Sequence, residues 1–389
     1  GYTATGNERW QAVNTAYTDA GSVSAIAYPS TFQVTHVRDA IYRMTAMVDA
    51  SGPTNIATFT WQGASRLATT ANQNGTGTTY SYDGFRNVAS LDHTLSGGGS
   101  IHKFEYAYDK VHNRRMEKNT FNATWIATLP GAVQTFLNGR NNKGDVYAYD
   151  MAYRLVDARY DVTNPLTEVQ NPGTQAFVTN IAYTIDGLGN RSQVATTPPT
   201  PPTQVMYATD VVNQYTTVGG TTRSHDGNGN LTDDGTYKFG YDFENRLVEL
   251  RNSTTNALIA SYRYDALGRR VEKAINGGAT TRYVLDGVQV VEEFDGSNAW
   301  QARYVYEDGL DQPRCMDRAD IADVNGNSNT TEVLRFHYHQ QALGSVTELT
   351  QPTGAVVEWV TYDVYGLPTI RNQVGMAVTQ SAVGNPWLY

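Results

Sequence analysis

Ser224, His225 and Asp226 are the residue types of a hydrolase triad, and they are consecutive in the sequence. Side chains of adjacent strand residues point to opposite faces, so three consecutive residues cannot form the proton relay of a triad. Asp226 is better interpreted as the first residue of a turn that covers 226–230. This pattern therefore predicts no catalytic residue.

His337 and His339 are two residues apart on a predicted strand, so both imidazoles face the same side, where they could share a metal ion. Structural zinc usually needs four ligands, and no cysteine or carboxylate pair lies at a matching offset. A buried, hydrogen-bonded histidine pair is the favoured interpretation. The single cysteine, Cys315, lies beside Arg314 without an identifiable base nearby in the sequence, which favours a buried, inert thiol.

Asp323, Asn325 and Asn327 place oxygen ligands at the first, third and fifth positions of a calcium-type loop. The match then fails, because Ser328 stands where glycine is wanted and Leu334 where a bidentate glutamate is required. A plain turn rich in asparagine and aspartate is favoured, and calcium at these three residues is the minor alternative. No cofactor is predicted.

Composition excludes several classes of protein. The 389 residues carry a net charge of −9, which provides no basic field for a nucleic-acid backbone. No apolar stretch approaches the ~18 residues of a membrane-spanning helix, and one cysteine permits no intrachain disulfide. Charged residues make up only 17%, while tyrosine (26) and glycine (35) are abundant, a composition that favours strands and turns.

A repeat organises the chain. Seven Tyr-Asp dipeptides occur, and similar residues recur around them. With degenerate copies included, the repeat is anchored at positions 39, 62, 83, 109, 150, 186, 210, 226, 242, 265, 286, 307, 339 and 363. Most spacings lie between 16 and 26 residues, and the three longer ones are 41, 36 and 32. Helices have no place in this pattern, so longer spacings indicate inserted loops.

Each repeat predicts a β-hairpin. The Tyr-x-Tyr alternation places both rings on one face of a strand, Asp-x-x-Gly supplies a turn whose carboxylate accepts main-chain hydrogen bonds, and an arginine four or five residues later opens the return strand. Stacked hairpins are expected to bring tyrosine over tyrosine and arginine beside the aspartate of neighbouring repeats. The residues predicted to carry this repeat are Tyr82, Asp83, Tyr108, Asp109, Arg114, Tyr149, Asp150, Arg154, Asp186, Arg191, Tyr241, Asp242, Arg246, Tyr264, Asp265, Gly268, Arg269, Tyr362 and Asp363. These tyrosines could alternatively form a platform for stacking carbohydrate, but repeat packing explains them without a ligand.

These blocks resemble the YD-repeat, or Rhs-repeat, family of large secreted and cell-surface β proteins. Residues 241–247 and 264–270 are close to the family consensus, and 338–345 and 360–366 resemble the start of the Rhs-associated core. We therefore expect an N-terminal lead-in over 1–34, a repeat array with inserted loops over 35–335, and an incomplete core over 336–389.

The resemblance implies an all-β fold in which tandem hairpins form a long spiralling sheet, part of a hollow shell. In bacterial relatives such a shell encloses a C-terminal toxin, and in animal relatives it belongs to a cell-adhesion receptor. The self-cleaving aspartyl site of relatives lies beyond residue 389, so the resemblance assigns no enzyme residue here. Two functions from different classes follow: a non-catalytic shell segment, or an extracellular adhesion or matrix component that binds carbohydrate or protein.

The ends suggest a piece of something longer. The chain opens at Gly1 without methionine or a visible signal peptide, and it closes on the apolar residues 385–389. We expect that stretch to enter a further strand, and the terminal strands to lie at an open edge or against another chain. The expected partners are therefore the remainder of the parent polypeptide or neighbouring copies, with an enclosed toxin as possible cargo, in a secreted or cell-surface setting.

Overall fold

The structure is a computed structural model that describes residues 12–52, 54–309, 311–320, 323–324, 326–329 and 331–388. These residues form 32 strands and three short helices, so the predicted all-β class is confirmed. The number of strands exceeds the ~28 expected from fourteen hairpins at two strands each. Among the described residues, no helix has the length and apolar character needed to cross a membrane.

The strands belong to two antiparallel sheets, in which strands that follow one another in the chain pair with each other. The first sheet, of 17 strands, contains β1 (Asn14–Tyr17), β2 (Val23–Ala27), β3 (Gln33–Arg38), β4 (Met44–Asp49), β5 (Thr54–Gln62), β6 (Arg66–Asn72), β7 (Gly77–Tyr82), β8 (Val88–Thr94), β9 (Ser100–Tyr108), β10 (Arg114–Phe121), β11 (Gly144–Tyr149), β12 (Leu155–Val162), β13 (Thr179–Ile185), β14 (Arg191–Thr197), β15 (Thr203–Thr209), β16 (Tyr215–Val218) and β17 (Thr221–Thr222).

The second sheet, of 15 strands, contains β18 (Ser224–His225), β19 (Leu231–Asp233), β20 (Tyr237–Tyr241), β21 (Leu247–Asn252), β22 (Leu258–Tyr264), β23 (Arg270–Ile275), β24 (Thr280–Asp286), β25 (Gln289–Asp295), β26 (Trp300–Tyr306), β27 (Pro313–Ala319), β28 (Val333–Gln340), β29 (Val346–Thr350), β30 (Val356–Tyr362), β31 (Pro368–Asn372) and β32 (Ala377–Val378). The expected boundary between repeat array and core, at 335/336, falls inside β28.

The expectation that the chain has no helices is wrong at two of the three long spacings. The spacing of 41 contains α1 (Ala123–Ile126) and α2 (Gly131–Arg140), and the spacing of 36 contains α3 (Pro165–Gln170). Asn122 caps α1 by accepting a hydrogen bond from the Trp125 amide. Because these helices lie between hairpins, they leave the strand pairing of the repeat intact.

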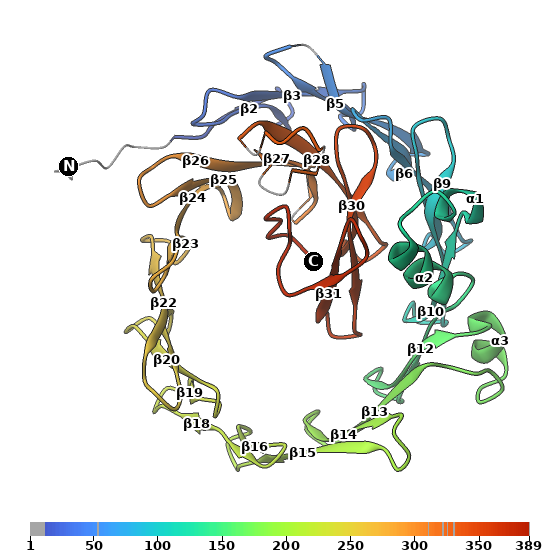
Figure 1. The fold of residues 1–389 in the computed structure, drawn as a ribbon, viewed down its shortest axis with the longest axis vertical. Coiled ribbons are helices and arrows are strands. Elements are labelled where there is room, and N and C mark those ends of the chain that lie inside the picture. Colours follow the sequence, from blue (N-terminus) through green and yellow to red (C-terminus); the bar gives the residue numbers. More distant parts are fainter. Residues whose placement is uncertain are drawn as a thin grey trace. The chain divides into compact units, whose positions relative to one another are not determined.

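The chain forms two compact units, of which unit 1 comprises 1–79, 93–98 and 280–389, and unit 2 comprises 80–92 and 99–279. In unit 1 two layers pack together, with β2–β6 lying beside β25–β30 (Figure 1). Their shared core includes Met47, Ile56, Tyr304, Phe336 and Tyr338, all no more than 1% exposed. Residues almost 300 positions apart therefore build one hydrophobic core.

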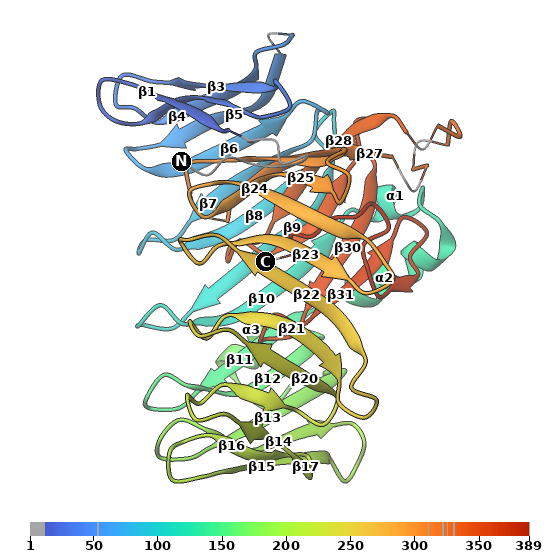
Figure 2. The same cartoon turned by 90° about the vertical axis from the view of Figure 1, so that its left-hand side faces the viewer.

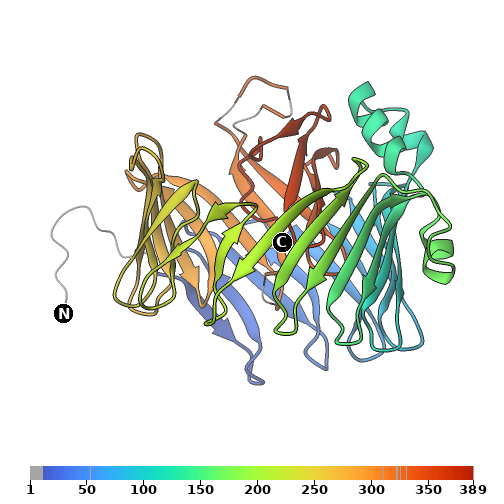
Figure 3. The same cartoon turned by 90° about the horizontal axis from the view of Figure 1, so that it is seen from below.

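Unit 2 is built differently, as successive hairpins that lie side by side (Figure 2 and Figure 3). A small core of Met116, Val146 and Val162 lies near α3. From 179 to 279, by contrast, only Tyr183 and Ala260 are buried among the described apolar residues. This stretch has no second layer of its own, so contacts between neighbouring hairpins must hold it together.

Candidate functional site

The Tyr-Asp turn is the unit of construction, and the turn at 265–269 shows it completely. One carboxylate oxygen of Asp265 accepts hydrogen bonds from the main-chain amides of Leu267 and Arg269, both at 2.9 Å. Its other oxygen accepts from Nε of Arg269 at 2.7 Å. Gly268 adopts a φ of +76°, which completes a five-residue turn with a bulge.

The same main-chain bonds recur along the chain. Each turn has an aspartate whose Oδ1 accepts from the amides two and four residues later, beginning at Asp39, Asp83, Asp109, Asp150, Asp186, Asp210, Asp226, Asp242 and Asp363. In the turn at Asp186, the hydrogen bond from the Asn190 side chain is the largest cause that lowers the pKa of the carboxyl. These carboxylates stabilise turns and have no geometry for acid–base catalysis.

We expected arginine beside the aspartate of a neighbouring repeat, and Arg154 and Arg246 do reach the main-chain carbonyl of that aspartate, although their ion pairs lie within their own turns. Arg154, Arg246 and Arg269 each pair with the aspartate of their own turn, four residues earlier. Arg154 then reaches the next repeat through the main-chain carbonyl of Asp186, at 2.9 Å. The side chain four residues after the aspartate lies close enough to donate to its carboxylate, whether it is an arginine, as at Arg154, or an asparagine, as at Asn190.

An arginine five residues after the aspartate packs on a tyrosine ring, as Arg246, four residues after its aspartate, does on Tyr264. The guanidinium of Arg114 lies 5.2 Å from the ring centre of Tyr147, and that of Arg191 lies 5.5 Å from the ring centre of Tyr183. Each arginine covers one face of a tyrosine on an adjacent strand, a contact of roughly 0.5–1 kcal/mol or more where water is excluded. The sequence did not separate these two arginine positions.

The tyrosine before the turn links consecutive repeats through its hydroxyl group. The hydroxyl of Tyr108 donates to the carbonyl of Val88 at 3.0 Å, and that of Tyr149 donates to the carbonyl of Arg114 at 2.9 Å. Further bonds of this kind run from Tyr241 to Leu231, Tyr264 to Leu247, Tyr306 to Val290 and Tyr362 to Val346. Most of these acceptors lie five residues after the anchor of the preceding repeat, so the bond recurs in register.

One anchor was placed wrongly. The sequence put the repeat at His339, but the turn is 341–345, with Gln341 in the position of the aspartate. His339 instead lies buried within β28. The degenerate Gln-Ala-Leu-Gly block obscured the register by two residues.

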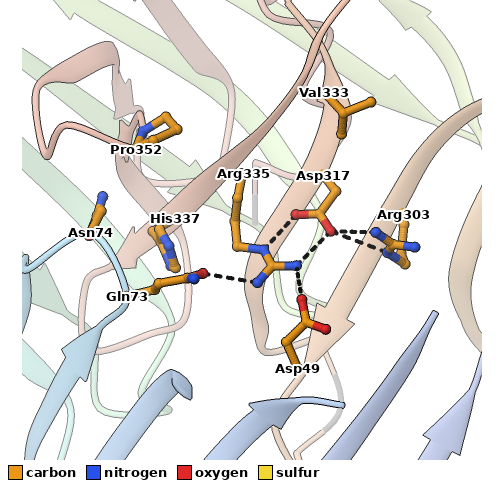
Figure 4. Close-up of a pocket in the computed structure, with 9 residues that line it drawn as sticks. All are labelled: Asp49, Gln73, Asn74, Arg303, Asp317, Val333, Arg335, His337 and Pro352. Atoms are coloured by element: carbon orange, nitrogen blue, oxygen red, sulfur yellow. Dashed lines mark hydrogen bonds and ion pairs between the residues drawn. The ribbon is translucent and has the colours of Figure 1, made fainter. Parts of the chain in front are cut away.

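Unit 1 contains a polar pocket of about 490 Å³, lined by charged side chains from both layers (Figure 4). Arg335 Nε and Nη2 donate to the two carboxylate oxygens of Asp317 at 2.7 and 2.9 Å. Nη2 also donates to Asp49 at 3.1 Å, and Nη1 donates to Gln73 at 2.9 Å. Nη2 of Arg303 donates at 2.7 Å to Oδ2 of Asp317, the oxygen that also accepts from Nη2 of Arg335.

This arrangement joins β4 and the turn after β6 in the first layer to β26, β27 and β28 in the second. Arg303 and Arg335 are both direct cross-strand partners of Asp317. Burial opposes ionisation of Asp317, but the hydrogen bond and charge of Arg335 lower its pKa below the usual value. With two guanidinium groups and two carboxylates paired, the pocket has the character of a structural clamp. The sequence analysis missed it.

Three histidines lie together in unit 1. His339 Nε2 lies 3.0 Å from the hydroxyl of Thr350, and the rings of His93 and His339 meet edge to face at 5.0 Å. His337 is also buried and lines the pocket. Burial lowers the pKa of His337 well below 6.5 and that of His339 to about 4, so both are neutral. In the described part of the chain, no three His, Cys, Asp or Glu side chains are arranged to hold a metal ion.

The remaining candidates have structural environments. Ser224 and His225 form the short strand β18, and Asp226 begins its turn by accepting from the amides of Asn228 and Asn230. Cys315 is fully buried, and burial raises the pKa of its thiol to about 12. A thiol with that pKa is protonated at neutral pH and a poor nucleophile.

The candidate calcium residues are only partly described. Asn325 lies outside the described residues. Asp323 accepts from the Ser328 amide at 2.9 Å, and the Asn327 side chain donates to Glu332 at 2.8 Å. These bonds suit an Asx-type turn, and calcium binding there stays a prediction.

The C-terminal stretch folds back onto unit 1, contrary to the expectation that 385–389 enters a further strand. The Trp387 ring packs edge to face against Tyr304 and Tyr306, with ring centres 5.9 and 5.8 Å apart. The carbonyl of Leu388 accepts from the Val346 amide at 2.7 Å. Tyr389 lies outside the described residues. The last strand, β32, pairs with β31 at the end of the second sheet.

Comparison with known proteins identifies this repeat. The model of the teneurin YD-shell family matches residues 137–309. Residues 137–309 are therefore a YD-repeat region similar to those of the teneurin and Rhs type. Among curated proteins, the tRNA3(Ser)-specific nuclease WapA of Bacillus spizizenii is 31% identical over 193 residues, which is 49% of this chain and 8% of that protein. The tRNA nuclease WapA of Bacillus subtilis matches with the same identity and coverage.

Solved structures share the fold of this YD-repeat region. TcdB2-TccC3 without its hypervariable C-terminal region matches with a TM-score of 0.69 and 15% identity, over 97% of this chain and 19% of that chain. The Photorhabdus luminescens Tc holotoxin pore matches with a TM-score of 0.65 and 16% identity, over 93% of this chain and 18% of that chain. The predicted YD/Rhs resemblance is confirmed, and the chain spans less than a tenth of the curated relatives' length.

Proposed function

We propose that this YD-repeat region is a non-catalytic structural segment of a large secreted or cell-surface protein, forming part of a shell around a C-terminal toxin or other cargo. The observation that carries the proposal is the single-layer stretch 179–279, in which turns, tyrosine hydroxyl bonds and guanidinium–ring contacts replace a core. With a hydrophobic core of its own, such a stretch would be an ordinary globular domain. A self-supporting single layer suits a wall.

The paired charges of unit 1 support the same proposal. Asp49 comes from β4 and Gln73 from the turn after β6, whereas Arg303, Asp317 and Arg335 come from strands more than 200 residues later. A wall that holds cargo needs its distant strands fastened together. This clamp uses its charged groups on each other, which leaves them unsuited to substrate chemistry.

The test uses the full-length parent protein and limited proteolysis. We expect the segment that follows the repeats to resist protease in the wild type and to be cleaved at least tenfold faster in an Arg335→Met variant. Arg251→Met is the matched control, because its partner Glu249 is 43% exposed and the pair lies at the surface of unit 2. Equal cleavage of the wild type and of the separately expressed following segment would contradict enclosure.

The second candidate function is an adhesion or matrix component that binds carbohydrate. It needs open aromatic faces, whereas one face of Tyr147, Tyr183, Tyr262 and Tyr264 is covered by a guanidinium. Glycan-array binding by the chain, lost in a Tyr262→Ala variant, would favour adhesion over the shell.

A further inference from the structure

The ladder of paired strands in unit 2 is interrupted at Arg223. The first sheet ends at β17 and the second begins at β18, and Arg223 is the only residue between these two short strands. β17 pairs with β16 through Thr221 and Thr222, whereas β18 pairs with β19 and with no other described strand. Figure 1 shows this point of the strip of hairpins between the labels β16 and β18. The five residues 221–225 therefore connect two separate sheets.

Arg223 makes the hydrogen bonds that cross this interruption. Its main-chain amide donates to the carbonyl of Thr216 on β16 at 2.8 Å. Its guanidinium donates to the main-chain carbonyl of Asp234, in the turn between β19 and β20. Residues 205–222 and residues 224–241, all of which the structure describes, share no hydrogen bond, ion pair or ring contact with each other. Arg223 alone is therefore bonded to both sides.

The sequence explains why this repeat is weakly joined to the one before it. In the next two repeats, the tyrosine immediately before the aspartate donates its hydroxyl to a carbonyl of the preceding repeat, as Tyr241 and Tyr264 show. Before Asp226 that position is His225, and Arg223 takes the place of the other tyrosine of the pattern. The imidazole of His225 makes no hydrogen bond to the residues that the structure describes. This repeat therefore lacks the tyrosine link.

Packing does not replace the missing bonds. Between 205 and 241, all described, no apolar residue is buried. The contact that remains is small: the methyl group of Thr221 lies against Gly235, where an added Cβ would come within 2.3 Å of it. A stretch with few ladder bonds and no buried side chains opens at a low cost in free energy. Such stretches act as hinges, because a few residues at the ends of elements absorb the change in φ and ψ.

We propose that residues 221–225 form a hinge in the strip of unit 2, about which the hairpins before residue 219 move relative to those after residue 231. The guanidinium of Arg223 limits the movement, because its bond to the carbonyl of Asp234 breaks when the strip opens. A fixed bend needs several bonds across the joint to hold its angle, and here Arg223 alone supplies them. The proposal concerns the strip itself and does not depend on what the strip encloses.

Distances between pairs of nitroxide spin labels on the full chain test this proposal. The labels are attached to cysteines introduced at exposed turn tips, and Cys315 needs no replacement because it is fully buried. Val211→Cys with Phe243→Cys spans the interruption. Met151→Cys with Val211→Cys spans the same number of Tyr-Asp turns in the continuous ladder from β11 to β16. Pulsed electron double resonance should give a distance distribution at least about twice as wide for the first pair.

Three further variants locate the hinge. Arg223→Met should widen the distribution of the first pair and leave that of the second unchanged, whereas Arg251→Met, which breaks an exposed pair away from the hinge, should change neither. His225→Tyr restores a hydroxyl that can donate to the carbonyl of Tyr215, the fifth residue after Asp210, so it should narrow the first distribution to the width of the second. Equal widths for the two pairs without these variants would show a fixed bend and overturn the proposal. A first distribution that Arg223→Met leaves unchanged overturns it as well.

Discussion

The hydroxyl of Tyr264 donates a hydrogen bond of 2.8 Å to the main-chain carbonyl of Leu247, which belongs to the preceding repeat. This bond crosses from one hairpin to the next in a stretch that has almost no buried core. We expect Tyr264→Phe to lower the free energy of unfolding by about 1 kcal/mol, since one partly buried hydrogen bond is lost and the ring remains. Urea unfolding followed by tryptophan fluorescence or circular dichroism measures the change.

Tyr262→Phe is the control for this prediction. Tyr262 lies on the same strand and packs against Arg270, whose guanidinium is 5.7 Å from the ring centre. Removing its hydroxyl should change the stability by less than 0.5 kcal/mol, as surface substitutions usually do. Equal destabilisation by both variants would show that the hydroxyl bond is not the cause.

Two glycines of one turn should respond differently to alanine. Gly189 has a φ of +96°, while Gly187 in the same turn lacks a positive φ, and a Cβ at either position meets no atom within 4 Å. Gly189→Ala should therefore destabilise by roughly 1–2 kcal/mol through backbone strain alone. Gly187→Ala should be neutral or stabilise by about 0.4–1 kcal/mol, because it restricts the unfolded chain. The difference between the two urea midpoints is the measurement.

The repeat could be predicted because its information is local. Asp265 and Arg269 are four residues apart, so their turn is visible in the sequence, and the Tyr-x-Tyr pattern fixes the face of each strand. The helices at 123–140 and 165–170 could not be predicted from the repeat, since they lie in segments that do not follow it. Their short lengths also give little periodicity to detect.

The clamp of unit 1 could not be predicted because it is non-local. Arg335 and Asp49 are 286 residues apart, and nothing in either neighbourhood indicates the other. The packing of Trp387 on Tyr304 could not be predicted either, since an apolar C-terminal sequence is compatible both with a further strand and with a segment that packs on the core. Sequence spacing reveals contacts within a hairpin and between adjacent hairpins, and it loses them where layers pack.

Loss of Arg335 should be among the most destabilising single changes in unit 1. The side chain of Asp317 is 3% exposed, so Arg335→Met leaves a buried carboxylate with one of its two guanidinium partners. Breaking a buried pair on one side typically costs about 3–5 kcal/mol. Calorimetric unfolding or urea titration of the variant tests this value.

A double variant separates charge burial from lost packing. Asp317→Asn combined with Arg335→Met removes both charges, so the combined loss should be smaller than the two single losses added together. The exposed pair Arg251 and Glu249 provides the contrast, with an expected loss of at most about 1 kcal/mol for Arg251→Met. Additive losses at Asp317 and Arg335 would contradict the coupling inferred from their 2.7 Å contact.

Unit 1 should lose stability as the pH falls from about 6.5 toward 4. Burial is the main cause that lowers the pKa of His36 and of His339 to about 4, and it also lowers the pKa of His337 well below 6.5. Near pH 6.5 these histidines therefore bind protons in the unfolded chain but not in the folded chain. The free energy of unfolding is highest above pH 6.5 and falls as the pH decreases below it.

Each such imidazole contributes a slope of up to about 1.4 kcal/mol per pH unit. The buried carboxyls of Glu292 and Glu358 act in the opposite direction, because burial raises their pKa values above 4.5, so acid favours the fold at these two positions. The histidine effect should be followed between pH 6.5 and 5.5, where imidazoles of the unfolded chain take up most of their protons. Urea unfolding at half-unit steps of pH measures the slope. His339→Gln removes one of these imidazoles, so it should reduce the slope by up to about 1.4 kcal/mol per pH unit, even if that variant is less stable at pH 7. A free energy of unfolding that stays constant over this range in the wild type would show that these histidines are protonated in the folded state.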